Sequence, residues 1–223
     1  MSESLGLSVP TDPKQARSKQ TKEKIVQAAI QLFEQRGYEK TTSNDIATEA
    51  GVSVGSFYVY FTDKRQLLLT IFDRLADELY KNIFDGLKAE HLFDDELRPR
   101  IRQAVANTIL DKQKHSGLHR VISELVLKDA EFAERRKAVM DRSVAKLQEL
   151  ISLASKAGLT WDIDAEAASF VVQRVVFDLS QDYVIGYCEF DQPRAVDALT
   201  DMIYRFVFKP GAQDLAQQQP DHS

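Results

Sequence analysis

Two histidines, four residues apart, have the spacing that most directly suggests metal chemistry. On a helix, His115 and His119 would lie one turn apart and could offer two nitrogen ligands to one ion. Gly117 lies between them, no glutamate is placed as in the zinc motif H-E-x-x-H, and the sequence holds no cysteine cluster. The pattern therefore favours no metal and no cofactor.

Other reactive residue types give no stronger indication of catalysis. Cys188 is the chain's one cysteine, so it cannot form an internal disulfide, and it is more typical of a small core hydrophobe than of a thiol sensor. Asp94 and Asp95 fall in an expected loop, where carboxylates are more often solvated than catalytic. Neither a glycine-rich phosphate loop nor a G-x-S-x-G elbow occurs. We therefore predict that the protein is not an enzyme.

A run of hydroxyl groups suggests a different chemistry, hydrogen bonding to a nucleic acid. In SVGSFYVYF, Phe57 and Phe61 are four residues apart and can share a buried helical face. The hydroxyls can then point outward to phosphates and base edges; they belong to Ser53, Ser56, Tyr58 and Tyr60. This helix carries no charge, so attraction to a polyanion must come from its flanks, from Lys64, Arg65 and the N-terminal segment.

Two turns position that helix. Thr42 and Asp45 have the spacing of a capping box, which predicts that a short helix begins there. Gly51 stands where a helix ends in the left-handed conformation, and Ser53 is a good N-cap for a helix over residues 54–61. Asp63 and Gln66 repeat the capping spacing, so a further helix follows. Two helices joined by a short glycine-containing turn form the helix-turn-helix plan, whose second helix enters the major groove of DNA.

The run TTSNDIATEAGVSVGSFYVYFTDKRQLL, residues 41–68, closely resembles the DNA-binding domain of the TetR family of transcriptional regulators. That family's pattern is roughly TT-x-x-(D/E)-(I/L)-A-x-x-A-G-V-S-x-G-(T/S)-(L/F)-Y-x-(Y/H)-F-x-x-K-x-x-L-(L/I), and nearly every fixed position is matched. A helix from about Thr21 that ends at Gly37-Tyr38 extends the resemblance backward. The rest of the chain is similar to the family only in length and helical pattern. A helix-turn-helix can also be a packing unit alone, as in some adaptor domains that bind protein.

The resemblance implies which residues face double-stranded DNA. We expect phosphate contacts from Thr42, Tyr58, Tyr60 and Lys64, and base-edge contacts from Ser43, Asn44, Val54, Gly55 and Ser56. Ser53, the expected N-cap of the second helix, also belongs to the residues expected to face DNA. Arg17 lies on the approach to the first helix, where relatives often reach the DNA backbone or minor groove, although a solvated helix start is an equal alternative.

The net charge of the whole chain is negative, so it fits a DNA-binding protein only when the N-terminal part is counted separately from the remainder. The net charge is −5, yet residues 14–24 hold five basic residues and one acidic residue, a local charge of +4. Residues 1–66 hold nine basic against eight acidic residues, or +1, so the remainder carries −6. No apolar run approaches the ~18 residues of a membrane span, and the N-terminus lacks the features of a secretory signal. We therefore expect a cytoplasmic protein without membrane contact.

The hydrophobic periodicity predicts an all-α fold of two domains. We expect a disordered N-terminus over 1–13, a three-helix DNA-binding domain over 14–66, a larger helical effector-binding and dimerisation domain over 67–208, and a disordered tail over 209–223. A long helix from Asp63 to about Gly86 links the two domains. Two final helices, at about 164–187 and 194–208, carry more apolar surface than one copy could cover. They could fill a monomer core, but the resembled family dimerises through them, so we expect a homodimer.

The sequence as a whole predicts a ligand-responsive regulator, most simply a repressor that a small molecule releases from a palindromic operator. Candidate effector-contacting residues are the aromatic and polar side chains of the body: His119, Phe132, Trp161, Phe170, Arg174, Phe177, Asp178 and Tyr183. Each could instead belong to the core or an interface, and an apolar or aromatic effector would suit them. The alternative is a helical enzyme or metal-binding protein with an incidental helix-turn-helix.

Overall fold

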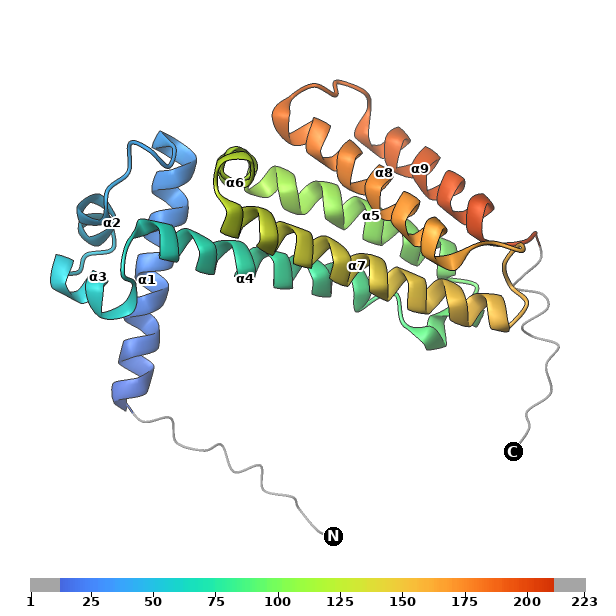
Figure 1. The fold of residues 1–223 in the computed structure, drawn as a ribbon, viewed down its shortest axis with the longest axis horizontal. Helices are drawn as coiled ribbons and strands as arrows, with labels where there is room; N and C mark the ends of the chain where they lie inside the picture. Colours follow the sequence, from blue (N-terminus) through green and yellow to red (C-terminus); the bar gives the residue numbers. More distant parts are fainter. Residues whose placement is uncertain (1–12, 211–223) are drawn as a thin grey trace, which may run out of the picture. The chain divides into compact units, whose positions relative to one another are not determined.

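In a computed structural model, residues 13–210 are described, and every regular element among them is helical. The helices are α1 (Pro13–Arg36), α2 (Ser43–Glu49), α3 (Val54–Tyr60), α4 (Lys64–Phe84), the 3-10 turn η1 (Ala89–Phe93), α5 (Leu97–Lys114), α6 (Ser116–Lys128), α7 (Ala130–Lys156), α8 (Ala165–Ile185) and α9 (Gln192–Val207). The expected all-α class is confirmed (Figure 1). The segments 1–12 and 211–223, which hold nearly all of the two predicted disordered ends, lie outside the described residues.

The chain divides into two compact units within α4, between Ile71 and Phe72. The first unit comprises α1, α2, α3 and the first turns of α4. Its centre is a set of fully buried apolar side chains from all four helices, including Ile25, Phe33, Ile46, Phe57 and Leu67. Burying a Leu, Ile or Phe side chain contributes about 1.5–3 kcal/mol, so five such residues hold a small unit together.

Helix α1 begins at Pro13, eight residues before the predicted start at Thr21. The first turns carry no apolar stripe, because residues 14–20 are all exposed. A prediction based on hydrophobic periodicity therefore had no signal there. Proline suits the first position of a helix, since its missing N–H would have no partner in any case.

The second unit consists of the remainder of α4, η1 and α5 to α9. In it α7 runs beside α4 and α8, and α5 contacts both α8 and α9 (Figure 1). Phe72 of α4 meets Phe132 of α7 edge to face with ring centroids 6.4 Å apart. Two ion pairs join the same helices, Asp73 to Arg135 and Asp77 to Arg142.

The helix ends of this unit follow their local sequence. Asp129 separates α6 from α7 and accepts hydrogen bonds from the N–H groups of Glu131 and Phe132, so the junction between the two helices is capped. Asp164 caps α8 in the same way. An isolated antiparallel bridge pairs Thr160 with Phe208 and fastens the end of α9 to the loop between α7 and α8.

Candidate DNA interface and effector cavity

The turn between α2 and α3 has the geometry that its sequence predicts. Thr42 accepts a hydrogen bond from the backbone N–H of Asp45 at 3.1 Å, and the Asp45 carboxylate accepts from the backbone N–H of Thr42 at 2.9 Å. The Thr42 hydroxyl also donates to this carboxylate at 2.7 Å, and that bond, followed by the bond from the Thr42 backbone N–H, lowers the pKa of the Asp45 carboxyl. Gly51 has φ +66°, a conformation that costs glycine nothing. The predicted capping box and glycine turn are thus confirmed.

Helix α3 divides into a buried and an exposed face. Phe57 and Phe61 are buried, with ring centroids 5.9 Å apart. Tyr58 is 54% exposed and Val59 is 77% exposed. Val59 was not among the predicted DNA contacts, although its place beside Tyr58 on a helix anchored by Phe57 is a signal that could have identified it. An exposed valine can make apolar contact with a thymine methyl group.

The residues predicted to face DNA lie on the surface of the first unit. The exposed ones are Arg17, Thr42, Asn44, Ser53, Val54, Gly55 and Tyr58, and the half-buried ones are Ser43, Ser56, Tyr60 and Lys64. Two hydroxyls already have partners: the oxygens of Ser53 and Ser56 are 2.8 Å apart, and Tyr60 donates to the hydroxyl of Ser18 at 3.1 Å. Ser18 was not predicted, and its bond places Tyr60 against α1.

Lys64 makes contacts that the sequence did not predict. Its ammonium group donates to the carbonyl oxygens of Tyr38 at 2.8 Å, Thr41 at 2.9 Å and Glu39 at 3.4 Å, and lies 4.2 Å from the centre of the Tyr38 ring. A cation with these partners holds the turn between α1 and α2. The phosphate contact of Lys64 stays a prediction beside this structural role.

Positive charge in this unit instead lies on α1. The side chains of Arg17, Lys19, Lys22 and Lys24 are all exposed. Lys22 places its ammonium 5.6 Å from the centre of the Phe61 ring, which ties this part of α1 to the end of α3. The basic residues that the sequence analysis counted are thus available to a polyanion.

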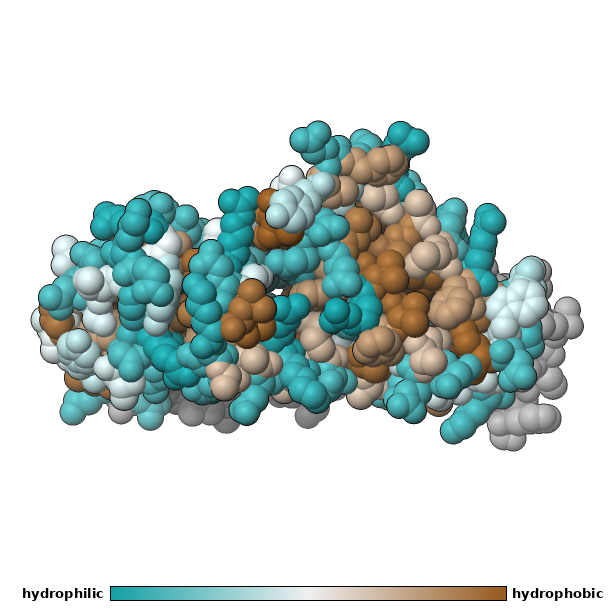
Figure 2. Space-filling view, turned by 45° about the horizontal axis from the view of Figure 1, so that its top comes forward, coloured by the Kyte–Doolittle hydropathy of each residue, from teal (hydrophilic) through white to brown (hydrophobic). Residues whose placement is uncertain are grey.

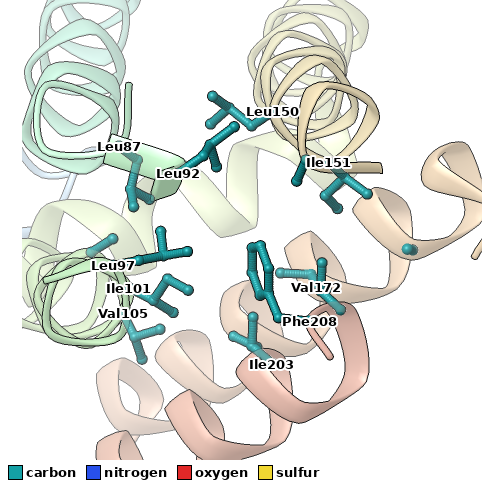
Figure 3. Close-up of a cluster of buried hydrophobic side chains, with 14 of the residues drawn as sticks. Leu87, Leu92, Leu97, Ile101, Val105, Leu150, Ile151, Val172, Ile203 and Phe208 are labelled. Atoms are coloured by element: carbon teal, nitrogen blue, oxygen red, sulfur yellow. The ribbon is translucent and has the colours of Figure 1, made fainter. Parts of the chain in front are cut away.

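The second unit contains an apolar cavity of about 170 Å³. Aliphatic and aromatic side chains from α4, η1, α5, α7, α8, α9 and the residues that follow α4 and α9 line it. Ten of them converge on a common space in Figure 3: Leu87, Leu92, Leu97, Ile101, Val105, Leu150, Ile151, Val172, Ile203 and Phe208. Its few polar lining groups include Thr108, whose hydroxyl donates to the carbonyl of Ala104, and Gln173. The cavity can hold an apolar molecule about the size of one aromatic ring, the occupant of an engineered cavity of about 150 Å³.

A smaller cavity of about 70 Å³ adjoins the first and has a different lining. The two share the side chains of Ala76, Leu79, Val139, Met140 and Phe177. The smaller one is also lined by four ionisable residues: Asp111, Lys112, His119 and Arg136.

Burial dominates the protonation of these four groups. It lowers the pKa of Lys112 to about 7, with the neighbouring charge of Arg136 as the second cause, and it lowers the pKa of His119 to about 4. It also lowers the pKa of Arg136 and raises the pKa of the Asp111 carboxyl. His119 is therefore neutral near pH 7.

Only two of the predicted effector residues, His119 and Phe177, line a cavity. Phe132 is fully buried in the core between α4 and α7. The remaining five point elsewhere: Trp161, Phe170, Arg174 and Asp178 are exposed, and the hydroxyl of Tyr183 donates to the carbonyl of Phe190. The other six predicted effector residues thus line neither cavity.

The lining residues that the sequence analysis missed are mainly aliphatic. Leucine, isoleucine and valine at helical spacing have the same pattern whether they fill a core or surround a void. Lys112 was missed because lysine is seldom buried, and its place between Asp111 and Gln113 predicts a solvent-facing turn.

Among residues 13–210, no helix is long and apolar enough to cross a membrane. Nor does that range contain a group of three or more histidine, cysteine or acidic side chains placed to hold a metal ion.

Comparison with known proteins extends the resemblance. Residues 25–71 match the sequence model of the bacterial regulatory proteins of the tetR family. The uncharacterised helix-turn-helix regulator YvdT of Bacillus subtilis (strain 168) is 25% identical over 196 residues, which are 87% of this chain and 96% of YvdT. A protein of Escherichia coli K12, named a probable acrEF/envCD operon repressor, is 24% identical over 87% of this chain and 90% of its own length.

Solved structures share the fold. A protein described as a TetR-family transcriptional regulator of Mesorhizobium loti MAFF303099 has a TM-score of 0.71 at 19% identity, over 86% of this chain and 99% of that one. A complex of SmeT with triclosan has a TM-score of 0.66 at 19% identity, over 86% of this chain and 93% of SmeT.

A capped helix-turn-helix with an exposed second helix, joined to a helical body, defines a DNA-binding transcriptional regulator. Within that class, residues 25–71 match the tetR family, and the relatives along most of the chain are named as helix-turn-helix regulators or repressors.

Proposed function

We propose that the protein is a homodimeric repressor that binds a near-palindromic operator and leaves it when a small molecule enters the body. The observation that carries the proposal is helix α3, which is uncharged, anchored by buried Phe57 and exposed at Tyr58 and Val59. In the helix-turn-helix plan such a helix enters the major groove. The name of the Escherichia coli relative supports the repressor role.

Contacts with DNA would come from three sets of residues. Thr42 and Tyr58 are proposed for phosphates, together with Arg17 and the exposed lysines of α1. Ser43, Asn44, Val54, Gly55 and Ser56 are proposed for base edges, and we add Val59 for an apolar contact. Ser53 and Tyr60 position these groups through their bonds to Ser56 and Ser18.

The apolar surface of α8 and α9 supports a dimer. Both helices expose large apolar side chains, namely Phe170, Val171, Val175, Met202 and Phe206. In Figure 2 hydrophobic residues gather over the part of the second unit that these helices form. A four-helix contact between two copies would cover them and would present two α3 helices to grooves about 34–36 Å apart.

Response to a small molecule is supported by the cavity of about 170 Å³ in the body. SmeT, which shares the fold, has been solved with triclosan. Helix α4 begins in the DNA-binding unit and continues into the lining of both cavities through Ala76 and Leu79. An effector that binds two arrangements of α4 with different free energies would shift their balance, typically by about 1–3 kcal/mol.

The test is binding of the purified protein to the DNA upstream of its own gene across a salt series. We expect affinity to fall steeply with salt, because phosphate contacts release counterions. Tyr58→Ala should weaken binding by at least about tenfold, a loss of about 1.4 kcal/mol. Tyr187→Ala, which removes an equally large exposed tyrosine from the second unit, is the matched control and should bind like the wild type. Equal affinity for unrelated DNA would contradict sequence-specific regulation.

A further inference from the structure

The smaller cavity contains a buried cation whose partners are all neutral. Lys112 is 2% exposed, and its ammonium donates only to the carbonyl of Phe177 at 3.3 Å and the amide oxygen of Gln181 at 3.4 Å. Both distances are longer than the 2.7–2.9 Å of a charge-assisted hydrogen bond. Within residues 13–210, no carboxylate forms an ion pair with Lys112.

A second cation approaches the same place. The ammonium of Lys112 lies 3.5 Å and the guanidinium carbon of Arg136 4.8 Å from the centre of the Phe177 ring. Two like charges near one ring repel each other, and burial of an unpaired charge is costly. Burial lowers the pKa of Lys112 most and the charge of Arg136 lowers it next, while Asp178 and Asp111 act in the opposite direction without forming an ion pair with it.

The acidic groups nearby do not fill that position. Asp178 forms an ion pair with Arg174 at 3.8 Å and lies on the exposed side of α8. Asp111 lines the cavity, but its Oδ2 atom is buried without a hydrogen-bond partner, and burial raises its pKa. The Nε2 atom of His119 is likewise buried and unpartnered. Among the described residues, the cavity therefore holds polar atoms without hydrogen-bond partners beside a cation that no carboxylate contacts directly.

The larger cavity, which adjoins the smaller one, indicates the chemistry of the remaining part of the ligand. It is almost wholly apolar, and Phe177 belongs to the lining of both cavities. A molecule that places a charged end near Phe177 can therefore extend an apolar body toward Ile101, Val172 and Ile203. By comparison with a cavity of about 150 Å³ that accepts benzene, the body would have roughly six to ten carbons.

We propose that the effector is an amphipathic carboxylate, whose anionic head lies between Lys112 and Arg136 and whose apolar body fills the larger cavity. This inference rests on the proposed function in one respect, that the body binds an effector. The charge of the head and the length of the apolar part are new predictions.

The test compares four probes on the purified full-length chain by isothermal titration calorimetry at pH 7. Octanoate, 1-octanol and octylamine share a tail and differ in the head, while acetate has the head alone. We expect octanoate to bind at least about tenfold more tightly than 1-octanol, because charge-assisted hydrogen bonds are roughly twice as strong as neutral ones. Octylamine and acetate should bind more weakly than either.

Variants assign the preference to the two cations. Lys112→Met and Arg136→Met should each reduce octanoate affinity by about tenfold and leave 1-octanol affinity unchanged, a difference of about 1.4 kcal/mol. Lys137→Met is the matched control, since Lys137 follows Arg136 on α7, has a side chain that is 76% exposed and lines neither cavity. Equal binding of octanoate and 1-octanol, or an unchanged preference in Lys112→Met, would overturn the proposal.

A chain-length series tests the apolar part without any mutation. From butanoate to octanoate, affinity should rise by up to about fourfold for each methylene, which corresponds to about 0.8 kcal/mol. It should stop rising once the cavity is filled. Affinity that does not depend on chain length would overturn the assignment of the larger cavity.

Gel shifts with the upstream DNA separate this inference from the proposed function. Loss of octanoate binding with intact DNA binding would overturn the carboxylate proposal alone. Octanoate binding with the predicted head preference, but no release of DNA, would uphold the ligand class and contradict the ligand-responsive repressor.

Discussion

Two lysines, one in each unit, each contact an aromatic ring and neutral oxygen atoms, but the lengths of their hydrogen bonds differ. Lys64 has close bonds of 2.8 and 2.9 Å to carbonyls that a turn directs at it. Lys112 has long bonds of 3.3 and 3.4 Å and an almost fully buried side chain. The first lysine completes the structure of the DNA-binding unit, whereas the second leaves the body with an unpaired charge. Under the proposed function, the unit that presents a fixed surface to DNA satisfies its lysine internally, whereas the unit proposed to bind an effector leaves polar groups available for it.

The largest expected effect tests whether the DNA-binding unit depends on a filled core. Phe57→Ala removes a fully buried ring and should lower the free energy of unfolding by about 3–5 kcal/mol. Urea denaturation followed by circular dichroism measures this change. Tyr187→Ala, at a residue that is 83% exposed, should change stability by less than about 0.5 kcal/mol. Similar effects of the two variants would refute the assigned core.

The next prediction contrasts the two lysines directly. Lys64→Met should destabilise by about 1.5–3 kcal/mol, the worth of hydrogen bonds to a charged group. Lys112→Met should be neutral or stabilising at pH 7, because it removes a buried charge that lacks an anion. Urea denaturation of both variants measures the difference. A Lys112→Met protein as unstable as Lys64→Met would show that the carbonyl of Phe177 and the amide of Gln181 satisfy the ammonium.

A pH series sharpens the same contrast. The pKa of Lys112 is about 7 in the folded protein against 10.5 in the unfolded chain, so above pH 7 the unfolded state binds more protons. Stability should therefore rise with pH between about 7 and 10, by up to roughly 1.4 kcal/mol per pH unit. The charged groups that face Lys112 are Arg136, Asp178 and Asp111.

Denaturation at pH 7, 8 and 9 measures this rise, and the difference from Lys112→Met isolates one residue. The variant should show a flatter profile than the wild type. Parallel profiles would mean that Lys112 keeps its ordinary pKa in the folded state.

The smallest expected effect is the loss of stability when a glycine with positive φ is replaced, and this loss should be the same in both units. Gly51 and Gly158 both have a positive φ, +66° and +77°, with open space where a Cβ would stand. Each substitution by alanine should cost about 1 kcal/mol through backbone strain alone. Gly55→Ala, in ordinary helical conformation, is the control and should stabilise by about 0.5–1 kcal/mol. Unequal costs at Gly51 and Gly158 would mean that one turn carries further constraints. Thermal unfolding measures all three.

The sequence predicts local features well because few residues determine them. Thr42 with Asp45, Ser53 with Ser56, and Asp164 at the start of α8 are each determined within four positions. Likewise the family pattern of residues 41–68 depends on neighbouring residues, and it identified the exposed face of α3.

Features that depend on distant residues could not be predicted. The carbonyls that bind Lys64 lie more than twenty positions earlier, and the partners of Lys112 lie 65 and 69 positions later. The cavity is formed by five helices whose apolar stripes are the same for a filled core. For this reason the predicted effector residues were aromatic and polar side chains, of which six line neither cavity, whereas most of the cavity lining is aliphatic.

The bridge between Thr160 and Phe208 holds the chain's one tryptophan beside the end of α9, where its fluorescence can report on that helix. Trp161 is the chain's one tryptophan, and beside that bridge its indole N–H donates to the carbonyl of Arg205 in α9 at 3.1 Å. Its fluorescence therefore comes from a single place, where the last helix meets the preceding loop. A shift of its emission maximum on titration would register displacement of α9 without any attached dye.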